Sequence, residues 1–297
     1  MLTSLFENNK DSGISVYVLT EGISSSNEEK LCKLASQYGQ RLIILRVTRN
    51  KFDNCPIRSG DHISLATYFR LTVTDLLPKE VDKVIYLDCD IIVDGSLREL
   101  WDTDINEYPI GACVDEAYWD LEKYQRLELS MDTPYFNAGV LLMNIAYWRE
   151  KNLTEKCFLF IENNRDKLLF HDQDTLNCLF HNNTLLLPLR YNLQTGFLYK
   201  SYMYGKYSEK IRNEVWQAIS SASIIHFSGC SKPWHSRYSR HPYSLFFEKY
   251  KSSSLWKDVI THKNSWKFAY NRLYSHLLYG LGLVQQPETY IITHVPC

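Results

Sequence analysis

Two carboxylates two positions apart are the strongest chemical feature of this sequence. Asp88 and Asp90 interrupt residues 84–93, an otherwise apolar segment that also contains Cys89. Neighbouring carboxylates repel each other and lose hydration among apolar residues, so a bound cation would offset both charges. The same spacing is common in solvated turns, but a solvated turn does not need apolar residues on both sides. The pair therefore indicates a metal site, and we place Cys89 among the substrate-binding positions.

A histidine near the C-terminal third of the chain extends this hypothesis. His226 ends an apolar run, and Gly229 and Lys232 follow it. A lone histidine is more often a satisfied core residue, but beside the aspartate pair an imidazole would add a nitrogen ligand, which favours Mn²⁺ with Mg²⁺ as the alternative. Gly229 would let the backbone approach a phosphate closely, and Lys232 would supply a point charge to a diphosphate.

Alternating strand-like and helix-like segments are predicted to position these residues. The run at 83–87 is continuously apolar, as expected for a strand covered on both faces of a parallel sheet. The pattern predicts a doubly wound, mostly parallel α/β fold, in which ligands bind at the carboxyl ends of the strands. Predicted strands lie at 14–19, 41–47, 83–87, 110–114 and 138–143, and predicted helices at 25–39, at 63–77 before Pro78, and from about Asp172.

Composition limits the function classes. The chain has 297 residues, and its 33 basic and 34 acidic side chains nearly cancel, so net charge gives no support for a nucleic-acid partner. Its eight cysteines contain no CxxC pair. With no export signal at the start and no apolar run of membrane-spanning length, we expect free thiols and a cytoplasmic location.

Five motifs in order resemble glycosyltransferase family 8, the retaining transferases that include bacterial lipopolysaccharide galactosyl- and glucosyltransferases. The resemblance covers a domain at residues 1–250 and leaves residues 251–297 as a tail. It implies a Rossmann-like nucleotide-sugar fold of the GT-A type. The motifs are Tyr68-Phe-Arg70-Leu71, Tyr86-Leu-Asp88-Cys-Asp90, Tyr135-Phe-Asn137-Ala-Gly139-Val-Leu, His171-Asp172-Gln173-Asp174, and His226-Phe-Ser-Gly229 with Lys232-Pro-Trp-His235.

The resemblance assigns roles to individual residues at the diphosphate. It implies that Asp88, Asp90 and His226 hold manganese and bridge it to the diphosphate of a UDP-sugar. Gly229 and Lys232 would grip the phosphates.

Further roles follow at the transferred sugar. Arg70 matches a basic residue near the donor, Asn137, Asp172 and Gln173 match positions lining the sugar, and Asp115 matches an acidic position facing the sugar or acceptor. Ordinary structural explanations carry about equal weight, because Asn137 also suits a turn, Asp172 a helix N-cap and Arg70 a surface ion pair.

The residue types also bear on stereochemistry. A retaining double displacement needs a carboxylate nucleophile at the anomeric carbon. The matched residue is Gln173, whose amide is a poor nucleophile. We therefore favour attack by the acceptor on the same face of the sugar, with Gln173 and Asp172 orienting it.

The chain departs from the family at its amino end. Family members begin with a strand whose Asp helps hold the uracil and ribose, followed by a helix whose end resembles residues 2–9. The given sequence lacks that strand, which predicts two neighbouring strands with unpaired backbone groups. Either the given start is late or the chain is impaired. We expect an upstream extension to raise nucleotide affinity and thermal stability together.

The tail is basic and aromatic. From Lys232 onward there are nine basic, three acidic and thirteen aromatic residues. One interpretation is peripheral contact with the anionic inner membrane, and the other is packing on the catalytic domain or a partner. The aromatic residues concerned are Trp256, Trp266, Phe268, Tyr270 and Tyr274.

The sequence as a whole predicts a metal-dependent retaining hexosyltransferase. It would move galactose or glucose from a UDP-sugar to a saccharide or lipid-linked saccharide, in lipopolysaccharide or surface polysaccharide synthesis. The alternatives are an impaired nucleotide-sugar-binding relative and a UDP-sugar hydrolase.

Overall fold

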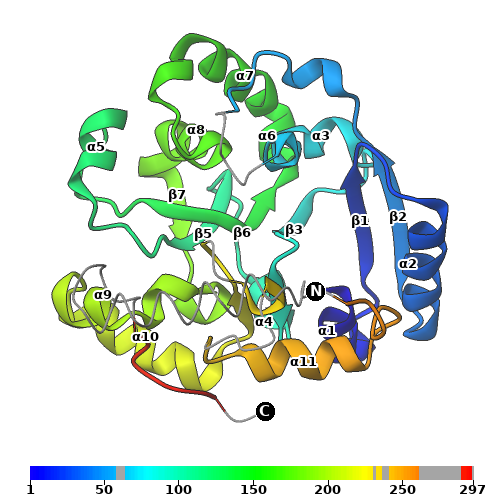
Figure 1. Cartoon of the computed structure of the whole chain (residues 1–297). Helices are drawn as coiled ribbons and strands as arrows, with labels where there is room; N and C mark the ends of the chain where they lie inside the picture. Colours follow the sequence, from blue (N-terminus) through cyan, green and yellow to red (C-terminus); the bar gives the residue numbers. More distant parts are fainter. Residues whose placement is uncertain (58–63, 230–231, 236–240, 261–288, 296–297) are drawn as a thin grey trace, which may run out of the picture.

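A computed structural model describes residues 1–57, 64–229, 232–235, 241–260 and 289–295, and its described strands form three sheets (Figure 1). The strands are β1 (Ser15–Thr20), β2 (Arg41–Arg46), β3 (Lys83–Leu87), β4 (Ile91–Val93), β5 (Ile110–Val114), β6 (Phe136–Asn144), β7 (Thr184–Leu186), β8 (Leu193–Gln194) and β9 (Ile224–His226). Their orders are β1-β2, β3-β6-β5-β7 and β4-β9-β8.

Helices surround these sheets. They are α1 (Leu2–Glu7), α2 (Ser25–Gln37), α3 (Val73–Leu76), α4 (Arg98–Asp102), α5 (Leu121–Leu127), α6 (Ile145–Glu150), α7 (Leu153–Asn164), α8 (His171–Phe180), α9 (Lys200–Gly205), α10 (Glu209–Ser221) and α11 (Ser244–Ser252). The predicted α/β class is confirmed, with the strands between helical layers.

The expectation of a mostly parallel sheet is corrected in one respect. β6 runs antiparallel to both β3 and β5, and β4 runs antiparallel to β9. The parallel pairs are β1 with β2, β5 with β7 and β8 with β9. A continuous apolar run indicates that both faces of a strand are buried. An antiparallel central strand covered by helices on both sides is buried in the same way, so the run does not fix the strand's direction.

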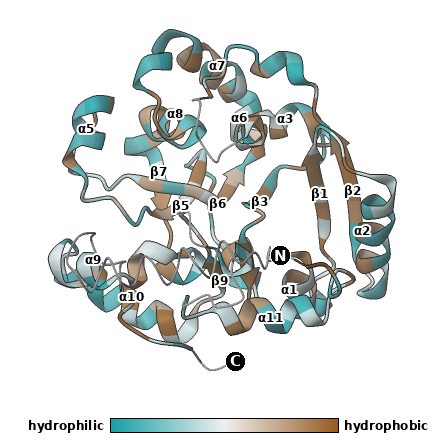
Figure 2. Cartoon of the chain, viewed as in Figure 1, coloured by the Kyte–Doolittle hydropathy of each residue, from teal (hydrophilic) through white to brown (hydrophobic). Residues whose placement is uncertain are grey.

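β6 shows how the two cores form. Val140 and Leu142 pack into one hydrophobic cluster, whereas Leu141 and Met143 pack into the other. Alternate side chains of a strand point to opposite faces, so this central strand is apolar throughout. Figure 2 shows hydrophobic colour along the strands and hydrophilic colour on much of the outer surface of α2.

One predicted helix takes a different form. Ile63 lies outside the described residues, and a 3-10 helix at Leu65–Thr72, here called η3, precedes the short α3. Over two turns the apolar positions fit a period of three about as well as 3.6. Arg70 lies in this 3-10 helix, and its side chain is buried.

An open slot separates β1 from β3. They belong to different sheets, and both line a cavity of about 2340 Å³ that continues to Asp88 and Asp90. Their side chains are mostly half-buried, whereas every residue of β6 is buried.

The described part of the tail packs on the rest of the chain. Tyr250 lies inside α11, and Trp256 donates a hydrogen bond to Asn27 over 2.9 Å. Lys200 and Ile291 donate backbone hydrogen bonds that join 198–200 to 289–291. The other aromatic residues of the membrane hypothesis lie outside the described residues, so the division at residue 250 stays a prediction. Among the described residues, no helix is both long and apolar enough to cross a membrane.

Candidate active site

The three predicted metal ligands converge in the structure. Asp88 and Asp90 lie in the turn between β3 and β4, and His226 is the last residue of β9. Their ligand atoms all lie within 4.8 Å of one another. The antiparallel pairing of β4 with β9 causes this, because it sets Ile91, the residue after Asp90, opposite His226.

The imidazole of His226 is oriented by Asn192. Nδ1 of His226 lies 2.9 Å from Oδ1 of Asn192, so Nδ1 carries the donated proton. Nε2 then faces Oδ1 of Asp90 at 3.3 Å. Two such atoms at this distance need a positive charge between them, either a proton on Nε2 or a bound metal ion, and an Nδ1 held by a second group is the arrangement a metal-binding histidine adopts. The donor set therefore fits a divalent metal.

Electrostatics at Asp90 agree with that reading. Burial alone would raise the pKa of Asp90, but the hydrogen bond and charge of His226, together with Lys232, hold this pKa well below its usual value. Nζ of Lys232 lies 2.5 Å from Oδ2 of Asp90. Asp90 is thus ionised over the whole physiological range.

Gly139 provides the space for this cluster. A Cβ atom at this position would overlap Cε1 of His226 and lie 2.9 Å from Oδ2 of Asp88. Its carbonyl accepts a 2.9 Å hydrogen bond from the amide of Asp88. A glycine on β6 therefore lets Asp88 and His226 approach the central sheet.

Arg70 is a buried organiser rather than half of a surface ion pair. Its Nη2 lies 2.9 Å from Oδ1 of Asp88, and its Nε lies 2.8 Å from Oδ2 of Asp172. Tyr86 donates a second hydrogen bond to Oδ1 of Asp88 over 2.9 Å and stacks its ring on the guanidinium. Thr67 also binds Asp172. The predicted N-cap alternative for Asp172 is wrong, because its carboxylate binds Arg70 and Thr67 and the cap position is Phe170.

The loop after β9 meets the cavity beside the metal ligands. Gly229 has φ of 77°, a left-handed conformation that favours glycine, and no atom of the described residues lies within 4 Å of its Cβ position. Ser228 donates a 2.6 Å hydrogen bond to Glu116, which tethers the loop to the end of β5. Gly229 and Lys232 both line the cavity.

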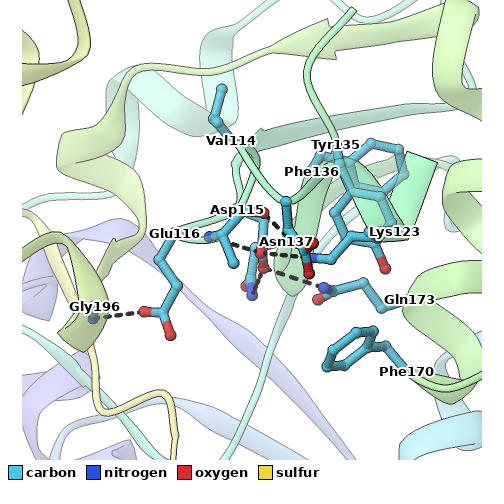
Figure 3. Close-up of polar contacts among 12 residues, drawn as sticks. Val114, Asp115, Glu116, Lys123, Tyr135, Phe136, Asn137, Phe170, Gln173 and Gly196 are labelled. Atoms are coloured by element: carbon cyan, nitrogen blue, oxygen red, sulfur yellow. Dashed lines mark hydrogen bonds and ion pairs between the residues drawn. The ribbon is translucent and has the colours of Figure 1, made fainter. Parts of the chain in front are cut away.

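A second polar cluster lies around Asp115, immediately after β5 (Figure 3). Its Oδ2 accepts hydrogen bonds from Asn137 and Gln173, each 3.1 Å long. Its Oδ1 accepts one from Lys123, also over 3.1 Å. Oε1 of Gln173 accepts the backbone N–H of Ala138 over 2.9 Å, so both ends of this amide are fixed.

The same cavity joins the two clusters. Asp88, Asp90 and His226 line it together with Asp115, Asn137 and Gln173. Cys89 also lines it and is exposed. Asp172 lies behind Arg70, and only 2% of its surface is exposed. It does not line the cavity itself but binds the guanidinium of Arg70, which does.

The sequence alone assigned no role to several organising residues. Tyr86 stood only as part of a family motif, although its position two residues before Asp88 in an extended segment puts both side chains on one face. Asn192, Lys123 and Glu116 meet the site only through tertiary contacts. Nothing local distinguishes them from ordinary polar residues.

Comparison with known proteins decides the family. The family model described as "Glycosyl transferase family 8" matches residues 1–237 of the chain. The chain belongs to glycosyltransferase family 8. The resemblance seen in the five motifs is thereby confirmed, and this family 8 member is a hexosyltransferase.

Its relatives are similar over most of their length. General stress protein A of Bacillus subtilis is 31% identical over 267 residues, which are 87% of this chain and 90% of that protein. Lipopolysaccharide 1,3-galactosyltransferase of Salmonella typhimurium is 28% identical over 86% of this chain and 74% of its own. The crystal structure of the galactosyltransferase LgtC with donor and acceptor sugar analogues superposes with a TM-score of 0.76 at 28% identity, covering 86% of this chain and 91% of that one.

Proposed function

We propose that this family 8 hexosyltransferase moves galactose or glucose from a UDP-sugar to a saccharide acceptor, in lipopolysaccharide or surface polysaccharide synthesis. The observation that carries the proposal is one cavity holding both a cation-binding triad and a cluster of carboxylate and amide groups suited to sugar hydroxyls. Two relatives are a lipopolysaccharide galactosyltransferase and a lipopolysaccharide glucosyltransferase, which supports these hexoses and this acceptor class.

The metal in this proposal is manganese, held by Asp88, Asp90 and His226. Two carboxylates with one imidazole favour Mn²⁺ over the stricter Mg²⁺. When bound, it would act as a Lewis acid that neutralises charge on the leaving diphosphate. Lys232 adds a positive charge on the same wall. Arg70 is committed to Asp88 and Asp172, so its contribution is to fix the ligand Asp88.

The sugar side supports retention by attack of the acceptor on the same face. Among the described carboxylates near Gln173, Asp115 is engaged by Lys123, Asn137 and Gln173 itself. Asp172 is engaged by Arg70. Neither is presented as an unengaged nucleophile, which a double displacement needs. Gln173 and Asp172 then orient the sugar, Gln173 directly and Asp172 through Arg70.

One assay separates this function from its alternatives. UDP release from UDP-galactose and UDP-glucose would be followed with Mn²⁺, with and without a panel of saccharide acceptors, and products identified by mass spectrometry. A transferase releases UDP faster with its acceptor and gives a product one hexose heavier. Equal UDP release without acceptor would indicate a hydrolase. Binding of UDP-sugar without release under any condition would indicate an impaired relative.

The proposal includes a peripheral contact between residues 251–297 and the cytoplasmic face of an anionic membrane. Its support is the basic and aromatic composition of the segment. Flotation with vesicles containing anionic lipid tests it. Binding that weakens with added salt is expected, and failure to float at low salt would contradict it.

A further inference from the structure

Lys123 is a buried cation that the proposed mechanism does not use. It lies on α5, and only 3% of its surface is exposed. Its Nζ lies 3.1 Å from Oδ1 of Asp115 and 3.4 Å from the carbonyl oxygen of Ala117. The rings of Tyr135 and Phe170 lie 4.2 Å and 4.9 Å from the same nitrogen. Lysine is almost never buried unless it is paired, so Asp115 accounts for its position.

Different groups bind the two oxygens of the Asp115 carboxylate. Lys123 binds one oxygen, and the two side-chain amides of Asn137 and Gln173 bind the other (Figure 3). Burial alone would raise the pKa of Asp115, but Lys123 and the hydrogen bonds of Asn137 and Ala117 lower it instead. Lys123, Asp115, Asn137 and Gln173 all line the cavity. This end of the cavity therefore combines hydrogen-bonding groups with no net charge from the pair.

We propose, building on the function above, that Lys123 positions and neutralises Asp115 and thereby selects an uncharged hexose on the donor. Hydroxyl groups of a neutral sugar suit a carboxylate and two amides whose directions are fixed. Because the pair carries no net charge, an ammonium or carboxylate group on the sugar would lose hydration there with no unpaired opposite charge to offset the loss. Lys123 is thus a positioning residue that sets donor specificity through Asp115.

The alternative is that Lys123 only ties α5 to the end of β5. Arg126 offers a matched comparison, because it lies on the same helix and its Nη1 is 2.8 Å from Oδ2 of the buried Asp174. Neither Arg126 nor Asp174 lines the cavity. Arg126→Met therefore removes a cation from an ion pair of α5 without removing a group that lines the cavity.

The test compares binding of UDP, UDP-glucose and UDP-glucosamine, measured by titration calorimetry with Mn²⁺ on the full chain. We expect Lys123→Met to bind UDP within about twofold of the wild type but UDP-glucose roughly tenfold more weakly, with UDP-glucosamine gaining relative to UDP-glucose. Lys123→Arg should recover part of the UDP-glucose affinity. Arg126→Met should lower the unfolding temperature and leave all three affinities within about twofold.

A double variant covers failure of Lys123→Met to fold. Asp115→Asn with Lys123→Met removes both charges and keeps the shape of the carboxylate group, so it should fold. We expect this double variant to bind UDP-glucosamine as tightly as UDP-glucose. If Lys123→Met, or the double variant, keeps the wild-type ratio of the three affinities, the inference is overturned. So does equal weakening of UDP and UDP-glucose. A wild type that binds neither UDP nor UDP-glucose contradicts the proposed function itself, which is a different result.

Discussion

Asn192 joins the two halves of the active site through His226. Its Oδ1 accepts from Nδ1 of His226 over 2.9 Å, and its Nδ2 donates to Oδ1 of Asn137 over the same distance. Asn137 in turn donates to Asp115. A fully buried amide thus orients a proposed metal ligand and one of the groups proposed to bind the sugar.

Replacing Asn192 should weaken metal binding. In Asn192→Ala the Nδ1 proton of His226 loses its acceptor, so the orientation of Nε2 is no longer fixed. Loss of such an outer partner typically lowers metal affinity about 10- to 100-fold. Manganese titration followed by electron paramagnetic resonance checks this, with the exposed Asn183→Ala as control. Equal affinities of the two variants would show that Asn192 does not orient the ligand.

Gly139 should not tolerate a methyl group. The added Cβ in Gly139→Ala would overlap His226 and Asp88, so we expect loss of manganese-stimulated turnover and a stability loss of roughly 1–3 kcal/mol. Gly205→Ala is the control, because nothing lies within 4 Å of its Cβ position. Thermal unfolding and initial rates measured on both variants decide the point. Normal turnover in Gly139→Ala would contradict the tight cluster.

Asp90 and Gln173 should differ in the kind of loss that they cause. Asp90→Asn removes a metal ligand and should abolish the increase in rate that Mn²⁺ produces. Gln173→Ala disturbs only orientation of the sugar, so the rate should fall on the order of 100-fold and remain measurable. Initial rates over a manganese series check both, with Asp102→Asn as an exposed control. A Gln173→Ala enzyme as inactive as Asp90→Asn would argue for a direct covalent role.

His241 should make stability depend on pH. Burial, and next the charge of Lys232, lowers the pKa of His241 from 6.5 to about 3. Between pH 6.5 and 3, His241 is therefore neutral in the folded state, whereas in the unfolded state it takes up a proton. The contribution of His241 to the free energy of unfolding is complete above pH 6.5 and is lost progressively as the pH falls toward 3.

The corresponding experiment compares unfolding free energies between pH 7 and 4.5. His241→Gln should show a shallower loss than the wild type, by at most about 1.4 kcal/mol per pH unit. The exposed His294→Gln should keep the wild-type slope. Identical slopes for the wild type and His241→Gln would contradict the neutral buried histidine.

Much of the fold, and the proposed grouping of Asp88, Asp90 and His226, was predictable because the signals are local or belong to family motifs. The strand at Lys83–Leu87 was predicted with its observed bounds, since continuous apolar runs report burial of both faces. The direction of β6 was not predictable, because strand direction depends on pairing with distant segments. The 3-10 winding of η3 also escaped, since tertiary contacts around Arg70 decide between two close helical periods.

Organising contacts were the least predictable part of the site. Asp88, Asp90 and His226 stand out because charged or polar residues interrupt apolar runs. Lys123 lies in a polar helix segment where a lysine is ordinary, and only folding brings it to Asp115. Asn192 precedes β8 and reaches His226 through the pairing of β8 with β9.

The most direct test of the central claim is anomalous diffraction at the manganese edge from crystals grown with Mn²⁺ and UDP. We predict one strong peak within coordination distance of Asp88, Asp90 and Nε2 of His226. A strong peak elsewhere, or none between these three side chains when UDP is bound in the cavity, would contradict the account.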